Sequence, residues 1–216
     1  MSQISALTAP DCLNEARARR QRDPTMRRLI VSNMMSLDGF VAGPNGELDW
    51  FVFEGFMKNT DFGQYARDLI SSVGAILLGR RTYEEFLSYW PEATDDDPVV
   101  TERMNNLPKI VFSKSLEKVS WGKFSTVKLV KEDAASEVAR LKAEAGKDLV
   151  IYGSAALVSS LLNAGLIDEL QIFLHPVVLG SGRPEFVGIS RRHKFELLKS
   201  TPLKSGAVVL YYRPAK

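Results

Sequence analysis

Short apolar runs alternate along the chain with segments that carry apolar residues at helical spacing. The runs "AILLG" at 75–79 and "LVIYG" at 149–153 are continuously apolar before their glycine, a pattern typical of strands buried on both faces of a parallel sheet. Strands are predicted at 27–35, 74–79, 109–113, 125–130, 148–153 and 168–180, with a hairpin at 194–214. Helices are predicted at 61–73, 82–90, 133–146 and 154–165. Thr82 would cap the second helix, with Glu85 completing a capping box.

This order of elements predicts an α/β fold with one domain. The expected architecture is a mixed, mostly parallel sheet flanked by helices, closed by a C-terminal antiparallel hairpin. The chain has 216 residues, 45% of them hydrophobic, which is enough for one full core. Residues 1–25 are polar and basic without core periodicity, so we expect a mobile extension there and a folded domain at 26–216.

Charge and composition argue against several classes of partner. The chain has 28 basic and 26 acidic residues, and a net charge of +2 is too balanced for a nucleic-acid groove or a membrane-binding face. No apolar run approaches the roughly 18 residues of a spanning helix. The single cysteine, Cys12, makes no internal disulfide and no cysteine-based metal site. With no secretory signal at the N-terminus, we expect a cytoplasmic protein that uses no metal.

Three predicted strands end in residues suited to bind anions. At 77–84, Gly79 permits a turn, and two arginines follow before a helix. The segment "VFSKS" at 111–115 ends in a hydroxyl group and a cation, and Gly153 precedes the helix after the strand at 148–153. Ligands of open α/β sheets bind beyond the carboxyl ends of strands, and helix N-termini attract phosphates. Each pattern alone is more often structural, but the three together suit a dinucleotide with a 2′-phosphate.

Familiar nucleotide-binding and metal fingerprints are absent from the sequence. The segment "GSGRPE" at 180–185 lacks the third glycine of GxGxxG and is interpreted as a turn between strands. There is no GxxxxGK[ST] for phosphoryl transfer and no zinc-deaminase signature. His175 precedes Pro176 in an apolar strand and is interpreted as a packed polar residue, not as a base.

Six segments together carry a resemblance to a known family. They are "SLDGFVAG" (36–43), "GELDW" (46–50), "LLGRRTYE" (77–84), "VFSKS" (111–115), "VIYGSAALVSSLLNAGLIDEL" (150–170) and "HPVVLGSGRPEF" (175–186). In this order they resemble the dihydrofolate reductase-like superfamily, and within it the reductase domain of the bifunctional riboflavin-biosynthesis protein. The resemblance implies an NADPH-dependent reductase. It also implies a homodimer, for which the strands "QIFLHPVVL" and "AVVLYY" are apolar enough to pair two sheets.

The resemblance also assigns residues to the cofactor. By position it gives Gly79, Arg80, Arg81 and Thr82 to adenosine-side phosphates, Ser113 and Lys114 to the 2′-phosphate, Gly153, Ser154, Ala155, Ala156 and Leu157 to the pyrophosphate, and Ala42 to the nicotinamide. The long segment 32–50 would then be a lid that excludes water during hydride transfer, with Trp50 near the reacting ring.

The reduction also needs a proton source or an electrostatic partner for the acceptor, and a carboxylate in an apolar cleft can supply either. The candidates are Asp38, Glu54 and Asp61, with Asp38 first, although its neighbour Gly39 leaves a turn role equally open. The best guess of acceptor is 5-amino-6-(5-phosphoribosylamino)uracil. Dihydrofolate, or a non-catalytic nucleotide-binding or assembly module of the same fold, are the alternatives.

Overall fold

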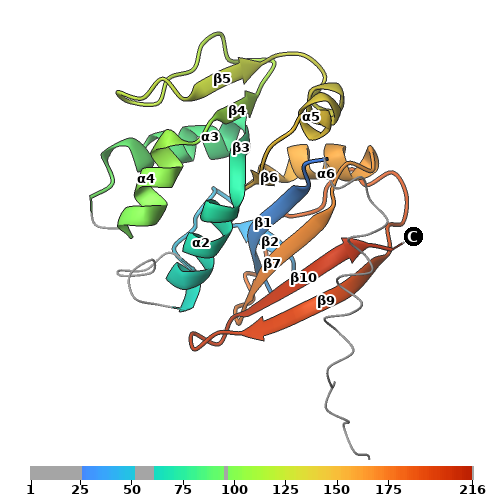
Figure 1. Cartoon of the computed structure of the whole chain (residues 1–216). Coiled ribbons are helices and arrows are strands. Elements are labelled where there is room, and N and C mark those ends of the chain that lie inside the picture. Colours follow the sequence, from blue (N-terminus) through green and yellow to red (C-terminus); the bar gives the residue numbers. More distant parts are fainter. Residues whose placement is uncertain (1–25, 52–60, 95–96, 216) are drawn as a thin grey trace, which may run out of the picture.

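The computed structural model describes residues 26–51, 61–94 and 97–215, which are built around one eight-stranded sheet (Figure 1). In chain order its strands are β1 (Leu29–Ser36), β3 (Val73–Gly79), β4 (Lys109–Phe112), β5 (Val127–Val130), β6 (Asp148–Ile151), β7 (Glu169–His175), β9 (Phe195–Pro202) and β10 (Val208–Pro214). Their spatial order is β5-β4-β3-β6-β1-β7-β10-β9. Neighbours from β5 to β7 are parallel, while β10 is antiparallel to β7 and β9. The predicted mixed sheet and C-terminal hairpin are confirmed; the expected extension at 1–25 lies outside the described residues.

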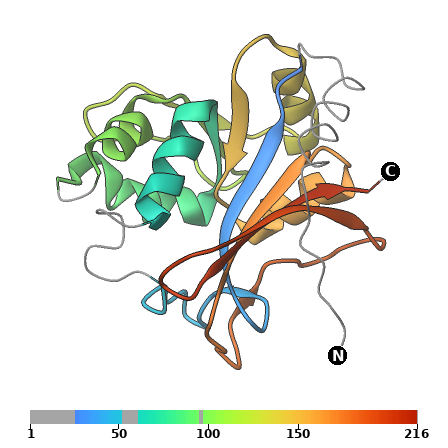
Figure 2. The same cartoon turned by 60° about the horizontal axis from the view of Figure 1, so that its bottom comes forward.

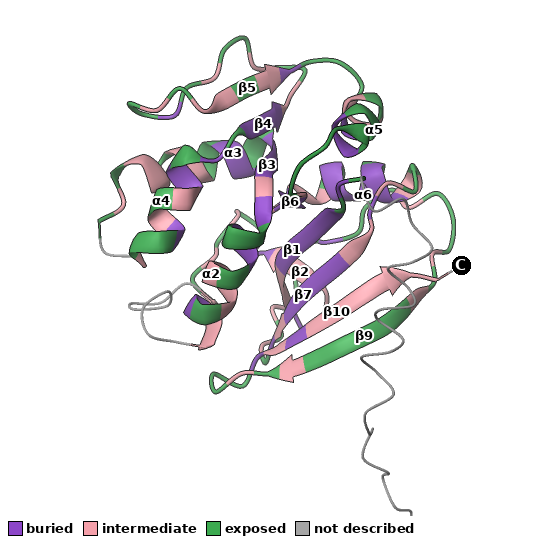
Figure 3. Ribbon diagram, in the orientation of Figure 1, coloured by how far each residue is buried: buried purple, intermediate pink, exposed green. Residues whose placement is uncertain are grey.

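Helices cover both faces of the sheet, and each side has its own core (Figures 1 and 2). One face carries α2 (Asp61–Ser72), α3 (Arg80–Leu87), the 3-10 turn η1 (Trp90–Glu92) and α4 (Pro98–Asn106); the other carries α5 (Ala134–Ala143) and α6 (Ala155–Asn163). Alternation along β1 divides its side chains between the two cores, with Ile30 facing α2 and Leu29 and Val31 facing α6. The central strands are therefore buried on both sides, whereas β9 is largely exposed (Figure 3).

Two helices differ from the prediction. Helix α3 begins at Arg80 with Gly79 as its N-cap, and no side chain makes a capping hydrogen bond, so the predicted capping box at Thr82 is wrong. Thr82 lies inside the first turn and is buried. Helix α4 is not among the predicted helices, although Pro98 opens it and the Asp97 carboxylate accepts hydrogen bonds from two backbone N–H groups of its first turn.

The chain after β7 also differs from the prediction. The strand predicted at 168–180 ends at His175, because Pro176 has no amide hydrogen to donate to the ladder. The chain then turns and returns as the short strand β8 (Arg183–Pro184), which pairs with β2 (Phe40–Ala42). The segment "GSGRP" is thus a turn that leads into a strand, and part of the predicted long loop at 32–50 is a strand as well.

Two findings limit what the described residues can hold. None of the helices in the described part of the chain is long and apolar enough to cross a membrane. Within the same residues, no group of three His, Cys, Asp or Glu side chains is placed to hold a metal ion.

Lys109, at the start of β4, is a buried cation without a carboxylate partner among the described residues. Its Nζ donates hydrogen bonds to the carbonyl oxygens of Asn105 (3.0 Å) and Leu107 (2.8 Å) and to Thr126 Oγ1 (3.1 Å). It also lies 4.6 Å from the centroid of the Trp121 ring. Three acceptors match the three donors of an ammonium group, so this side chain ties the end of α4 to the start of β5.

We expect Lys109→Met to lower the free energy of unfolding by roughly 1–3 kcal/mol, because methionine fills the space but cannot donate to the buried acceptors. Urea unfolding followed by circular dichroism measures the loss. Lys128→Met on neighbouring β5 is the control: Lys128 is exposed and pairs with Glu137 at 3.3 Å, so its loss should cost under about 1 kcal/mol. Equal losses of unfolding free energy in the two variants would show that the Lys109 hydrogen bonds do not contribute to stability.

Candidate active site

One cavity of about 1650 Å³ opens beyond the carboxyl ends of β3, β4 and β6. Gly79 is the last residue of β3, Ser113 directly follows β4, and Gly153 lies two residues beyond β6. All three line this cavity, so the three strand ends singled out in the sequence do face one space.

Every residue that the resemblance assigned to the cofactor lies on the wall of the same cavity. These are Ala42, Gly79, Arg80, Arg81, Thr82, Ser113, Lys114, Gly153, Ser154, Ala155, Ala156 and Leu157. They come from four separate stretches of chain, and their common location allows one elongated ligand to contact all of them.

The strand ends of β3 and β6 are in direct backbone contact. The N–H of Gly79 donates to the carbonyl oxygen of Gly153 at 2.9 Å. A Cβ atom on Gly79 would lie 2.5 Å from Ser154 Oγ, and one on Gly153 would lie 2.9 Å from Thr82 Oγ1. Gly153 also has a φ of +120°, which L side chains rarely adopt. Two glycines are therefore required here, and they leave backbone exposed toward the cavity.

Two helices begin at this joint. Gly79 is the N-cap of α3 and Ser154 the N-cap of α6, and neither helix has a side-chain capping hydrogen bond. The N–H groups of both first turns lack a side-chain acceptor from the cap, and the helix dipoles add positive potential. Such a pair of N-termini is suited to bind phosphate groups.

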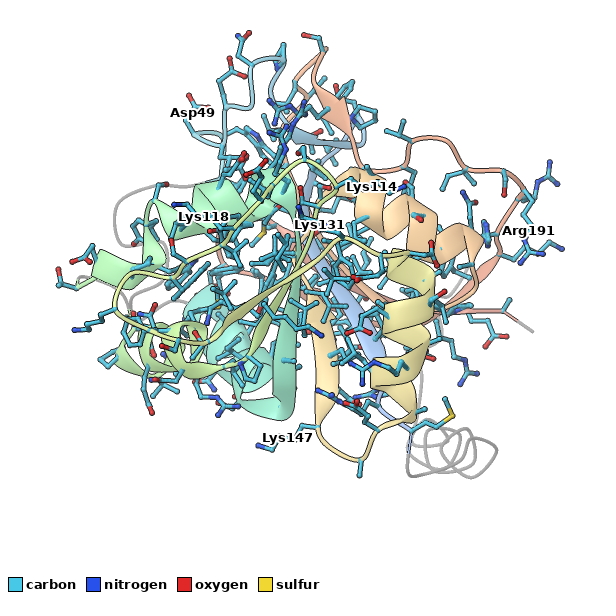
Figure 4. All side chains as sticks on the ribbon, turned by 90° about the horizontal axis from the view of Figure 1, so that it is seen from above. Asp49, Lys114, Lys118, Lys131, Lys147 and Arg191 are labelled. Atoms are coloured by element: carbon cyan, nitrogen blue, oxygen red, sulfur yellow. The ribbon has the colours of Figure 1, made fainter. Side chains whose placement is uncertain are left out.

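The strand ends of β4 and β5 contribute hydroxyl groups and cations. Ser113 Oγ accepts hydrogen bonds from the N–H groups of Ser115 (3.2 Å) and Leu116 (3.1 Å), which fixes the turn after β4. The exposed Lys114 follows in this turn, and Lys131 comes directly after β5. Both line the cavity, and Figure 4 shows them close together in a view from above. These lysines and hydroxyl groups make this end of the cavity well suited to bind a phosphate dianion.

Asp38, the first candidate acid, belongs to a turn. Its carboxylate accepts hydrogen bonds from Ser36 Oγ (2.7 Å) and from the N–H groups of Leu179 (3.2 Å) and Gly180 (2.7 Å). These bonds, that from Ser36 first, lower the pKa of Asp38. Asp38 is not among the residues that line the cavity, and its bonds tie the β1–β2 turn to the segment after β7. The geometry therefore favours the turn role that the sequence left open.

The other two candidate acids are not placed in the cavity either. Asp61 begins α2, and its carboxylate accepts hydrogen bonds from the N–H groups of Phe62 (3.1 Å) and Lys204 (2.6 Å). It is not part of the cavity wall. Glu54 lies outside the described residues.

The predicted lid segment is only partly at the cavity. Val41, Ala42 and Leu48 line it, as does Phe51 just beyond the segment, but Trp50 does not. The Trp50 ring packs edge-on against His175, with centroids 5.5 Å apart. His175 is buried, so its interpretation as a packed polar residue is confirmed, whereas the expected place of Trp50 beside the reacting ring is not supported by this geometry.

Glu185 is a cavity-lining acid that the sequence did not single out. Its side chain is 0% exposed, and Oε1 accepts a hydrogen bond from Asn33 Nδ2 at 2.7 Å. Oε2 is buried without a partner among the described residues. Burial raises the pKa of Glu185 to about 7, against the opposing effect of the Asn33 hydrogen bond. The carboxyl group can therefore hold a proton on Oε2 near neutral pH; in the sequence, nothing distinguished it from an exposed acid in a turn.

The comparison with protein-family models matches residues 27–209 to the RibD C-terminal domain. This chain belongs to the RibD C-terminal domain family. The chain is similar in sequence to the uncharacterized protein YyaP of Bacillus subtilis (strain 168). It is 32% identical over 191 residues, which is 86% of this chain and 94% of YyaP.

Solved structures agree with the family and the fold. A putative riboflavin biosynthesis protein from Shewanella sp. PV-4 superposes on this RibD-type chain with a TM-score of 0.70 and 27% identity, over 88% of this chain and 99% of the other. Dihydrofolate reductase from Enterococcus faecalis, complexed with NADP(H), gives a TM-score of 0.58 at 14% identity, over 88% and 97%. At that identity the second comparison speaks to fold alone, and it confirms the predicted dihydrofolate reductase-like fold.

The raised pKa of Glu185 predicts a particular pH dependence of stability. Between its ordinary pKa of 4.5 and the folded value of about 7, the folded state holds more protons than the unfolded state. This group therefore favours folding below pH 4.5, and its contribution is lost as the pH rises through about 7. A shift of this size corresponds to on the order of 3 kcal/mol. The Glu185→Gln variant has no carboxyl group to ionise at this position. Its free energy of unfolding, relative to that of the parent protein, should therefore rise by about that much between pH 5 and pH 8.

Urea unfolding at the two pH values measures this difference, and carboxylates common to both proteins cancel in it. Glu132→Gln is the matched control, because Glu132 also lines the cavity but is exposed. It should follow the parent protein at both pH values. A Glu185→Gln curve parallel to the parent would mean that Glu185 is ionised in the fold at both pH values.

Proposed function

We propose that this protein is an NADPH-dependent reductase that transfers a hydride to a pyrimidine- or pterin-type heterocycle. The observation that carries the proposal is the joint of Gly79 and Gly153, where two helix N-termini open into one cavity beside a pair of lysines. Membership of the RibD C-terminal domain family supports a reductase. The NADP(H) bound to the dihydrofolate reductase of the same fold supports the cofactor.

The residues present fit such a cofactor. The first turn of α6, from Ser154 onward, offers backbone N–H groups to a pyrophosphate. Lys114, with Ser113 and Lys131 beside it, offers charge-assisted hydrogen bonds to a 2′-phosphate. NADPH, when bound, would supply the hydride, and these residues, with Ala42 beside the nicotinamide, would hold it.

The reduction also consumes a proton, and we assign its supply to Glu185. Of the three acids expected from the sequence, the two that are described bind backbone N–H groups and do not line the cavity, whereas Glu185 lines it with one oxygen held by Asn33. The hydride and the Oε2 proton together saturate one double bond of the acceptor, and water then reprotonates the carboxylate.

Glu185→Gln should lower kcat and kcat/KM together by roughly 100-fold at unchanged NADPH affinity, because the interaction belongs to the transition state. Unaltered turnover in Glu185→Gln would move proton supply to water.

Family membership makes 5-amino-6-(5-phosphoribosylamino)uracil the first acceptor to test and dihydrofolate the second. The assay follows the loss of NADPH absorbance with each acceptor. Binding of NADPH without oxidation in any of these mixtures would favour the alternative, a nucleotide-binding module that does not turn over. Failure to bind NADPH at all would reject the proposed function.

A homodimer remains part of the proposal, but through a different strand than expected. Strands β7 and β10, which the sequence predicted to pair two sheets, are both internal to the sheet and present no free edge. Strand β9 is an edge strand, and its Leu197 and Leu198 are exposed at 55% and 39%. Light scattering of the parent protein and of Leu197→Lys tests this, and a monomer in both would reject it.

Cofactor discrimination gives a sharper test. Lys114→Ala should weaken NADPH binding by about 1.5–3 kcal/mol and NADH binding far less, because only NADPH carries the dianion that this lysine faces. Lys118→Ala is the matched control: Lys118 is exposed in the same loop but does not line the cavity (Figure 4). Isothermal titration with both cofactors measures the effect. An equal loss for NADPH and NADH would show that Lys114 does not read the 2′-phosphate.

A further inference from the structure

The cavity has a second end with a different chemistry. It is lined by aromatic side chains from α2, from α3 and the turn after it, and from the end of β6, namely Tyr65, Phe86, Tyr89, Trp90 and Tyr152. Phe86 lies 5.8 Å from Tyr152 and 6.2 Å from Trp90 between ring centroids. We call this set the aromatic lobe. It is continuous with the core beneath α2 and α4, where Leu69, Val100 and Met104 complete the wall.

The cationic side chains of the cavity come from other positions on its wall. Among the described residues that line it, the cationic side chains are those of Arg80, Arg81, Lys114, Lys131 and Arg183. The first four stand at strand and helix ends, where the proposed cofactor places its phosphates. Arg80 is also 3.6 Å from Glu84.

Among the described residues, Arg183 is then the remaining cation for an acceptor, and it has neighbours of its own. Its guanidinium group packs against Gly46, where an added Cβ would come within 2.8 Å of Nη2. Electrostatic attraction joins both Arg183 and Arg81 to Glu85, which also lines the cavity. A phosphate on the acceptor would have to compete with this carboxylate for a single arginine.

We propose that the aromatic lobe binds the acceptor, and that the acceptor is a planar, uncharged heteroaromatic or quinonoid ring without a phosphate group. The proposal rests on the proposed function, because it takes the other end of the cavity as the cofactor site. A flat ring gains stacking contacts and apolar burial on these side chains. A phosphate dianion brought beside them would lose its hydration without gaining partners.

The lobe also offers a polar group that could orient such a ring. Tyr152 lines the cavity, and its hydroxyl group has no hydrogen-bond partner among the described residues. The Tyr65 hydroxyl, in contrast, lies 3.0 Å from Ser32 Oγ and also bonds to Gln171. Burial raises the pKa of Tyr152 above its usual value, so the phenol remains a neutral donor. A carbonyl oxygen or ring nitrogen of the acceptor is the kind of group that would accept this hydrogen bond.

A pair of probes that differ in one phosphate tests the proposal. Riboflavin and FMN share the same ring system, and their binding to protein saturated with NADP⁺ is followed by flavin fluorescence, so the cofactor end is occupied. We expect riboflavin to bind at least as tightly as FMN. The unphosphorylated and phosphorylated forms of 5-amino-6-ribosylaminouracil, measured by calorimetry, should show the same order.

Tighter binding of the phosphorylated member by ten-fold or more in either pair would overturn the proposal, as would binding of neither riboflavin nor the unphosphorylated uracil. NADP⁺ affinity, titrated first, keeps the two proposals apart: loss of cofactor binding rejects the proposed function, whereas intact cofactor binding with the wrong probe order rejects only the acceptor class.

Variants of Trp90 locate the probe. Trp90→Ala should weaken riboflavin binding about ten-fold, in keeping with the loss of one stacking contact, while Trp90→Phe keeps most of it. NADP⁺ affinity should be unchanged in both, which shows that the variants are folded. Equal riboflavin affinity in Trp90→Ala and the parent protein would place the ring outside the aromatic lobe and overturn the assignment.

Discussion

The site depends on one backbone contact, the hydrogen bond from Gly79 to Gly153 that joins the ends of β3 and β6. Neither position has room for a Cβ, although for different reasons. Gly79 has an ordinary φ of −77°, so it is glycine because Ser154 lies too close, whereas Gly153 must also reach a positive φ. Because each glycine leads into a helix, the contact brings the N-termini of α3 and α6, which lie on opposite faces of the sheet, to one cavity.

The opposite wall of the cavity is held by bonds between loops. Asp38 ties the β1–β2 turn to the segment after β7, and pairing of β2 with β8 carries that segment back over the end of β1. This return places Glu185 against Asn33, inside the protein. The roles of Asp38 and Glu185 are therefore linked. The exposed, charged carboxylate of Asp38 binds the segment after β7. That segment places Glu185 inside the protein, where burial raises its pKa.

The sequence made some of this predictable and left some of it hidden. Apolar runs that end in glycine located β3 and β6, and the strand-end rule then predicted that Gly79, Ser113 and Gly153 would share one cavity. Helix α4 had an available signal, since Asp97 and Pro98 form an ordinary helix start, but its apolar face is short. Glu185 could not be found by pattern. A carboxylate two residues beyond a glycine turn looks solvated, and its burial follows from the pairing of two very short strands, which no local periodicity reports. The role of Asp38 was ambiguous in the sequence because a turn acid and a catalytic acid use the same residue type.

The division of the cavity into a cationic end and an aromatic end has a consequence for selectivity. An uncharged ring can be accepted by many apolar surfaces, and one extra group on it changes binding by only about 1–3 kcal/mol. A phosphate is different, because a dianion without partners in a partly dry cavity loses more hydration energy than stacking can return. If Arg183 remains engaged with Glu85, the lobe selects against phosphorylated rings mainly because its described residues offer no cation to the phosphate. Replacing Glu85 by glutamine would release the arginine without touching the aromatic wall, and FMN should then gain on riboflavin. An unchanged ratio of the two affinities in Glu85→Gln would mean that Arg183 lies too far from the lobe to reach a phosphate, and that the exclusion comes from the aromatic side chains alone.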